Sequence, residues 1–302
     1  APIAGQVWYD STAIAFQYRS SNPAGTWATT NALNTARDQV AGAGTTTSGL
    51  VFGENFGGET ELYNGTNWTE VNDLNTSRRG PAGAGASNTA ALAFGGNLAA
   101  PSPNAATDET ETWNGTNWTE VNDLNQARVF LTGAGTNTAA IAIGGATGAG
   151  GNPPQTGEAE TWNGTNWTEV CDLNTARNSF ASGGTTTSAV AFGGSGPTAD
   201  TEVWNGTSWT EVNNMNTARL GMGGAGSSST AALTFGGPSS SALVELWNGT
   251  NWAEQNDLNT GRAYSGSSKG SSTSALCMGG GPSTASEEWT SPTEASETIT
   301  TS

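Results

Sequence analysis

The stretch Glu111-Thr-Trp-Asn-Gly-Thr-Asn-Trp-Thr-Glu-Val121 decides the fold of this chain. Asn114-Gly115 at its centre supplies the positive φ that a tight hairpin turn requires. On either side of the turn, Trp113 and Trp118 can face each other across a pair of antiparallel strands. The alternation after the turn has the period of two that marks a strand. The stretch therefore predicts a β-hairpin with an aromatic pair beside the turn.

Close copies of this hairpin recur along the chain with a period of roughly 42 residues. Ahead of each copy lies an apolar strand that closes on two glycines, as in Leu92-Ala-Phe-Gly-Gly96, where the missing Cβ permits crowding. After each copy comes an arginine, within Thr-Ala-Arg or a near copy of it, which opens a run of small residues in the next unit. The repeated residues are Trp68, Trp118, Trp167, Trp209 and Trp252, together with Arg37, Arg78, Arg128, Arg177, Arg219 and Arg262.

Four short strands in a unit of this length make one blade of a β-propeller. The sequence therefore predicts an all-β fold, with a six-bladed propeller over residues 25–302 and a lead-in hairpin over residues 1–24. Residues 25–30 have the pattern of a fourth strand without a blade ahead of it, and residues 287–289 have the pattern of a third strand. Pairing of these N- and C-terminal strands would close the ring. A seven-bladed ring, to which both ends contribute strand pairs, is the alternative.

The unit resembles the kelch repeat. The shared features are an apolar run ending in Gly-Gly, an aromatic residue, a spaced Trp, and an Arg that opens the next unit. Six copies cover nearly the whole chain from Asn31 onward, although Trp-Asn mostly stands where the family usually has Tyr-Asp. The resemblance implies a kelch-like propeller.

Composition and charge exclude several functions. The net charge is −17, and a polyanion repels phosphate backbones, so we expect no nucleic-acid partner. The chain has no histidine, which removes the commonest general base and the commonest transition-metal ligand. Copper chemistry of the galactose-oxidase kind, which is also built on kelch repeats, is thereby excluded, and we expect no cofactor and no metal. No stretch approaches 18 apolar residues, so membrane insertion is not expected. Cys171 and Cys277 fall in strands of distant blades, so no disulfide is expected between them.

The repeated polar residues are expected to be structural. We predict that each arginine makes a bidentate ion pair with the acidic strand of the neighbouring blade, with one Glu per repeat as its partner. Carboxylates such as Glu111 and Glu120 could suit a glycosidase, but they recur in most units, whereas a single active site needs only one set. Asn-x-Thr sequons such as Asn64 and the Asn-Asp-Leu-Asn segments, which could offer oxygens to calcium, are expected to form turns.

The places where the units differ are the better guide to function. Successive arginines are 41, 50, 49, 42 and 43 residues apart. The two long, consecutive units gain their extra residues between the Gly-Gly strand and the acidic strand, at 97–108 and 146–157. Equivalent loops emerge on one face of a propeller, and such insertions are often a binding face, with neutral drift as the alternative. The candidate ligand-binding residues in these loops are Asn97, Asn104, Asp108, Asn152 and Gln155.

The segment Gly5-Gln-Val-Trp-Tyr-Asp-Ser-Thr12 resembles a short hairpin module of phage tail fibres and related virion proteins. In that module a second aromatic strand and a Trp follow, here Ala15-Phe-Gln-Tyr18 and Trp27. The resemblance implies a place on the virion surface or elsewhere outside the cell. We therefore predict a non-enzymatic, tail-fibre-like propeller that recognises a cell-surface glycan or docks onto other virion or filament subunits. The alternatives are a secreted or cell-surface propeller that assembles with itself into a filament, and a carbohydrate-active enzyme that uses two carboxylates.

Overall fold

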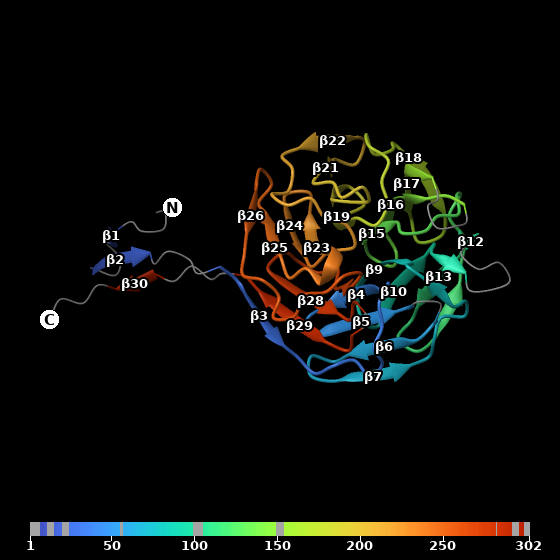
Figure 1. Cartoon of the computed structure of the whole chain (residues 1–302), viewed down its shortest axis with the longest axis horizontal. Helices are drawn as coiled ribbons and strands as arrows, with labels where there is room; N and C mark the ends of the chain where they lie inside the picture. The colour runs from blue at the N-terminus through green and yellow to red at the C-terminus, as the bar shows by residue number, and fades with distance from the viewer. Residues whose placement is uncertain are drawn as a thin grey trace.

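The computed structural model describes residues 24–54, 57–98, 105–148, 154–281 and 283–291, and the backbone of residues 7–10, 15–19 and 296–298. These residues form an all-β structure in which six four-stranded antiparallel sheets stand around a ring (Figure 1). The fold is a six-bladed β-propeller, and within the described residues the blade count is six rather than the alternative seven.

In each blade the first strand lies nearest the axis of the ring and the last strand lies at the rim (Figure 1). The blades, from inner to outer strand, are β4 (Ala41–Thr45), β5 (Ser48–Phe52), β6 (Thr60–Tyr63) and β7 (Trp68–Val71) in blade 1; β9 (Ala82–Ser87), β10 (Ala90–Phe94), β13 (Thr110–Trp113) and β14 (Trp118–Glu120) in blade 2; β15 (Thr132–Gly135), β16 (Ala140–Ala146), β17 (Gln155–Trp162) and β18 (Trp167–Val170) in blade 3; β19 (Ala181–Thr185), β20 (Ser188–Phe192), β21 (Thr201–Trp204) and β22 (Trp209–Val212) in blade 4; β23 (Gly223–Ser228), β24 (Ala231–Phe235), β25 (Val244–Trp247) and β26 (Trp252–Glu254) in blade 5; β27 (Gly266–Ser267), β28 (Ser274–Met278), β29 (Ser286–Thr290) and β3 (Thr26–Thr29) in blade 6.

Blade 6 is built from both ends of the chain. Strand β3 pairs with β29, and Trp27 lies opposite Trp289 in that register. The first and last blades also meet near the axis, where the N–H of Gln39 donates to the carbonyl of Tyr264 at 2.9 Å. Outside the blades, β1 (Val7–Asp10) pairs with β2 (Ala15–Arg19), and β2 pairs with β30 (Ser296–Thr298).

The hairpin turn differs in detail from the one expected. Only Gly115 takes a positive φ, of 92°. The side-chain oxygen of Asn114 accepts hydrogen bonds from the N–H groups of Thr116 and Asn117, both at 2.9 Å. The asparagine therefore contributes an Asx turn rather than a left-handed backbone. The same pair of bonds forms at Asn64, Asn163, Asn205 and Asn248.

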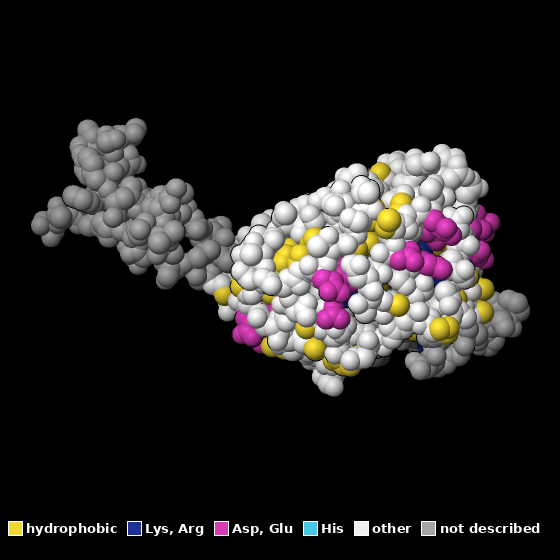
Figure 2. Space-filling view, turned by 90° about the horizontal axis from the view of Figure 1, so that it is seen from above, with side chains coloured by type: hydrophobic (Ala, Val, Ile, Leu, Met, Phe, Trp, Pro, Cys, Tyr) yellow, Lys and Arg dark blue, Asp and Glu magenta, His cyan; other side chains and the backbone are white. Residues whose placement is uncertain are grey.

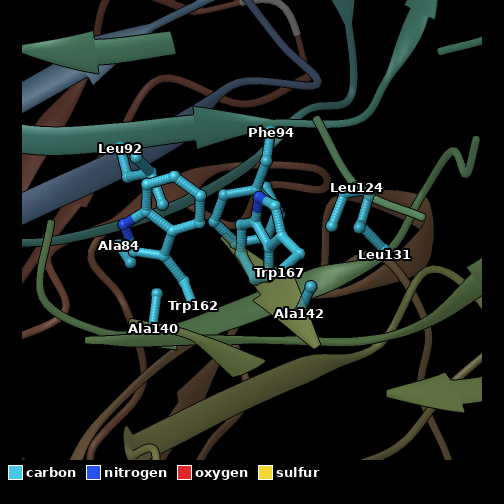
Figure 3. Close-up of a cluster of buried hydrophobic side chains, with 10 residues drawn as sticks. Ala84, Leu92, Phe94, Leu124, Leu131, Ala140, Ala142, Trp162 and Trp167 are labelled. Carbon is cyan, nitrogen blue, oxygen red and sulfur yellow. The ribbon is translucent and has the colours of Figure 1, made fainter. Parts of the chain in front are cut away.

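The hydrophobic core lies between neighbouring blades. Between blades 2 and 3, Phe94 packs against Trp167 with ring centroids 4.9 Å apart (Figure 3). Trp167 in turn faces Trp162 across its own hairpin at 5.4 Å. Aromatic pairs of this kind stabilise a fold by about 0.5–1.5 kcal/mol beyond the area they bury. Because each such cluster draws on two blades, a blade buries its apolar side chains only against its neighbours.

Candidate functional site

An arginine and a glutamate are buried together at each junction between blades. Arg128 Nη2 lies 2.8 Å from Glu160 Oε1, and both side chains are almost completely buried. The main-chain N–H of Arg128 donates to Thr107 of blade 2, so the arginine joins the backbone of one blade to β17 of the next. This pairing agrees with the structural role expected for the repeated arginine. The equivalent pairs in the described chain are Arg37–Glu61, Arg78–Glu111, Arg177–Glu202, Arg219–Glu245 and Arg262–Glu287.

The ion pair is not the bidentate contact that we expected. Arg128 Nη1 donates to the main-chain carbonyl of Glu158 at 2.6 Å instead of to the second carboxylate oxygen. That oxygen, Oε2 of Glu160, accepts from the main-chain N–H and the side-chain Nδ2 of Asn125, at 2.8 and 2.7 Å. The carboxylate therefore also fixes the loop that leads into the arginine. Burial lowers the pKa of Arg128, and the charge of Glu160 opposes this shift.

The repeated strand carboxylates are already engaged. Glu111 is completely buried, and its oxygens accept hydrogen bonds from Asn75, Thr76 and Arg78. Glu120 faces Glu111 in the strand register but is exposed on the outer strand. Glycoside hydrolysis needs two carboxylates that reach the same substrate. Here Glu111 is buried and Glu120 is exposed, so a substrate at Glu120 could not contact Glu111.

The candidate residues in the insertions are not gathered at one surface. Asn97 is only 2% exposed, because the insertion begins as strand β11 (Asn97–Leu98), which pairs with β8 (Arg78–Arg79). Asn97 is therefore not available as a surface ligand-binding residue. Asp108 is half-buried, and Gln155 is exposed at the start of β17. Asn104 and Asn152 lie outside the described residues.

Both insertions begin beside the axis of the ring. In blade 2, β11 lies between β8 and β12 (Ala105–Ala106), and β8 is followed directly by Gly80. In blade 3, Ala146 at the end of β16 bridges to Val129, which is followed directly by Phe130. The insertions thus stand on the face at which the chain enters the innermost strand of each blade.

Six residues form a ring on that face, one from each blade and each two positions after the repeated arginine. Main-chain hydrogen bonds of 2.6–2.9 Å join five of the six neighbouring pairs. All six residues have a left-handed backbone, which strains a residue other than glycine by about 1–3 kcal/mol. We call them the mouth ring: Gln39 (φ 55°), Gly80 (58°), Phe130 (54°), Ser179 (53°), Gly221 (61°) and Tyr264 (55°).

Two aromatic side chains of the mouth ring lie over the glycines next to them. A Cβ on Gly80 would stand 3.1 Å from the ring of Phe130, and one on Gly221 would stand 2.8 Å from the ring of Tyr264. Both aromatic rings are half-buried, and the mouth ring lines a cavity of ≈90 Å³. Burial raises the pKa of Tyr264, with a smaller contribution from Asp38, so its hydroxyl stays protonated near neutral pH.

This ring was not predicted from the sequence, because the residues after each arginine were interpreted as a uniform run of small side chains. The available signal was a phenylalanine and a tyrosine at a position that holds glycine or serine in three other units.

The described residues include no cluster of three or more His, Cys, Asp or Glu that could hold a metal ion. In the Asn-Asp-Leu-Asn segment of blade 2, Asp123 accepts a hydrogen bond from the N–H of Thr110 at 3.0 Å. Cys171 and Cys277 are both free thiols. No helix in the described part of the chain has the length and hydrophobicity to span a membrane.

Comparison with known proteins supports the fold. No family model matches the chain, and no curated protein matches it. Among solved structures, the chain is similar to that of YjhT, with a TM-score of 0.71 and 13% sequence identity over 88% of this chain and 96% of that chain. At that identity the likeness shows a shared fold and carries no function with it.

Proposed function

We propose that this protein is a non-enzymatic binding propeller that recognises a neutral glycan at the mouth ring and the adjoining insertions. The observation that carries the proposal is the presence of two half-buried aromatic rings, Phe130 and Tyr264, in the mouth ring. Phe130 directly follows Val129, which bridges to the base of the blade 3 insertion. Ligand sites combine aromatic surface with a few polar groups that fix orientation. Here Gln39 and Ser179 supply an amide and a hydroxyl to the same ring.

The charge of the protein favours a neutral ligand over an acidic one. The chain carries a net charge of −17, which repels anionic polymers that come within about a Debye length of its surface. Figure 2 shows the acidic side chains in separate groups, between which uncharged side chains cover most of that surface. A neutral sugar can pack its C–H face on an aromatic ring without this repulsion. Because the cavity at the mouth ring measures only ≈90 Å³, the sugar would lie across the ring and would not enter the cavity.

The alternative of a two-carboxylate hydrolase has less support. Glu111 and its equivalents are committed to buried ion pairs, and their removal would open the junctions between blades. Binding without turnover is therefore the activity that we propose. The resemblance of residues 5–12 and 15–18 to virion proteins supports a place on a virion or another external assembly. Subunits of that assembly would then be further partners.

A glycan array with matched variants tests the proposal. Phe130→Gly and Tyr264→Gly introduce the residue that blades 2 and 5 already hold at this position, so both variants are expected to fold. We expect the native chain to bind a neutral glycan without releasing sugar, and either variant to bind at least about tenfold more weakly, as for loss of an aromatic anchor. Leu243→Ala, which changes an exposed side chain on blade 5, should bind like the native chain. Released sugar, or unchanged binding by both glycine variants, would overturn the proposal.

A further inference from the structure

The single lysine of the chain replaces, near the axis of the ring, a glycine that recurs in the other five blades. Lys269 is seven residues after Arg262, in blade 6. The N–H of Ser268 donates to the carbonyl of Leu276, and the equivalent residues Ala43 and Leu50 are partners in blade 1, so the blades align without a shift here. The corresponding residue in the other five blades is glycine: Gly44, Gly85, Gly135, Gly184 and Gly226.

Lys269 lines a cavity at the centre of the propeller. Its walls include Gly42, Gly83, Gly133 and Gly224 from the innermost strands, and all six blades contribute to them. The cavity volume is ≈90 Å³, about three times the roughly 30 Å³ that one water occupies in the liquid. Sites for larger organic ligands measure about 300–1,000 Å³. The space therefore admits a group of only a few atoms.

No residue that the structure describes supplies a counter-charge to the ammonium group of Lys269. Lys269 makes no hydrogen bond or ion pair with any described residue, and it is the one ionisable side chain among the described residues that line the cavity. By contrast, the arginine at each blade junction is matched by a buried glutamate. Lys269 is half-buried, so its ammonium is partly removed from water without a protein partner, which is unfavourable. The desolvation lowers the pKa of Lys269 to about 8.

Hydroxyl groups from blades 3 and 6 line the same cavity. Thr132 Oγ1 lies 2.8 Å from Ser182 Oγ, and Ser267 donates to the carbonyl of Gly224 at 2.7 Å. Thr132 and Ser267 both line the cavity together with Lys269. Ser267 donates its proton to Gly224, and Thr132 donates to Ser182, which itself donates to the carbonyl of Gly133 at 3.0 Å. The amine therefore carries the recognition. A charged amine in a volume of this size matches a small, singly charged anion.

We propose that the central cavity binds a small monovalent anion, of the size of chloride or formate, with Lys269 as its counter-charge. The site adjoins the glycan site proposed at the mouth ring, because the two cavities share lining residues such as Leu131 and Phe180, but Lys269 lines only the central one. Its ligand differs in charge and size, and its charged group lies on a different residue of the unit. An anion there would neutralise the lysine and stabilise the folded state, because ligands that bind only the folded state stabilise it by mass action.

Thermal unfolding in matched salts tests this site. Sodium chloride and sodium formate are titrated into the full chain while sodium gluconate, whose anion is too bulky for the cavity, keeps the ionic strength constant. At a tenfold excess over the dissociation constant we expect the unfolding temperature to rise by about 3 °C. Lys269→Gly, which restores the residue of the five other blades, and Lys269→Met, which keeps the length of the side chain, should both lose the rise. An equal rise in the native chain and both variants would overturn the proposal.

A second measurement locates the anion directly. Crystals of the full chain soaked in sodium bromide should show an anomalous peak in the central cavity beside Lys269 Nζ, and crystals of Lys269→Gly should show none. An empty cavity in the native crystals would contradict the assignment. Lys269→Gly should still bind glycan at the mouth ring, so failure of one proposal leaves the other distinguishable.

Discussion

The indole N–H of Trp118 in blade 2 donates a hydrogen bond to the hydroxyl of Thr60 in blade 1, with 3.1 Å between Nε1 and Oγ1. Trp167 and Trp252 make the same bond to threonines of their preceding blades. At the three remaining junctions, Trp27, Trp68 and Trp209 have buried indole nitrogens without an acceptor in the described structure. The position of Thr60 is held there by Val244, Ser286 and Ala159, respectively. The outer-strand tryptophan thus recurs in all six blades, whereas the threonine that accepts its indole hydrogen bond is present at only three of the junctions.

Replacing Ala159 with threonine should supply the missing acceptor at the junction of blades 3 and 4. We expect Ala159→Thr to raise the free energy of unfolding by about 0.5–1.5 kcal/mol, the net value of a typical hydrogen bond. Chemical denaturation measures the change. In a Trp209→Phe background the gain should disappear, because the donor is absent. A gain of equal size in that background would show that better packing, and not the hydrogen bond, is the cause.

Removing one partner of a blade-junction ion pair should be strongly destabilising. Arg128→Met leaves the Glu160 carboxylate buried without its cation, and we expect a loss of about 3–5 kcal/mol. Equilibrium denaturation in urea gives the value. The double variant Arg128→Met with Glu160→Gln should lose less than the sum of the two single variants, because no buried charge is left unpaired. Additive losses would mean that the two side chains act independently.

Relieving backbone strain in the mouth ring should stabilise the protein. Ser179 has a φ of 53°, and the strain of about 1–3 kcal/mol expected there exceeds the roughly 0.5–1 kcal/mol entropic penalty of glycine. Ser179→Gly should therefore increase the free energy of unfolding, whereas Ser179→Ala should not. Both values follow from thermal and chemical denaturation. If both variants lose stability equally, the hydroxyl and not the backbone governs this position.

The lysine in the central cavity predicts a pH dependence of stability. The pKa of Lys269 is about 8 in the folded protein, against 10.5 for the free side chain. Between these two pH values the unfolded chain binds more protons, so the native chain gains stability as the pH rises through this window. Below about pH 8 the lysine is protonated in both states and this contribution is constant.

The measurement compares native chain and Lys269→Gly by chemical denaturation from pH 7 to pH 10 in sodium gluconate. The difference between their free energies of unfolding should shift in favour of the native chain above about pH 8, by at most about 1.4 kcal/mol for each unit of pKa difference. Titration of Tyr264 and other groups common to both proteins cancels in this difference. A constant difference across the range would show that Lys269 remains solvated.

The sequence by itself determined the blade and the partners at the blade junctions, and it favoured six blades over seven. Each blade is formed by strands that follow one another in the chain. The alternation of side chains around Trp118 and the Asn-Gly turn can therefore be recognised within one unit of some 40 residues. The pairing of Arg128 with a glutamate of the next blade followed from repetition, because a residue that recurs in each unit must meet the same neighbour each time. The burial of Asn97 was not predicted, since it depends on pairing with a strand about 18 residues earlier in the chain.

Only the tertiary structure decided which residues surround the axis. Phe130 meets Gly80, and Tyr264 meets Gly221, across separations of more than 40 residues. Lys269 shares one cavity with residues from all six blades. The repeat predicts the strands and junction residues of each blade. Residues that differ from the repeat in only one or two blades, such as Phe130, Tyr264 and Lys269, lie near one another only at the axis. Those contacts exist only after the ring has formed, because closing it brings six distant segments within one side-chain length of each other.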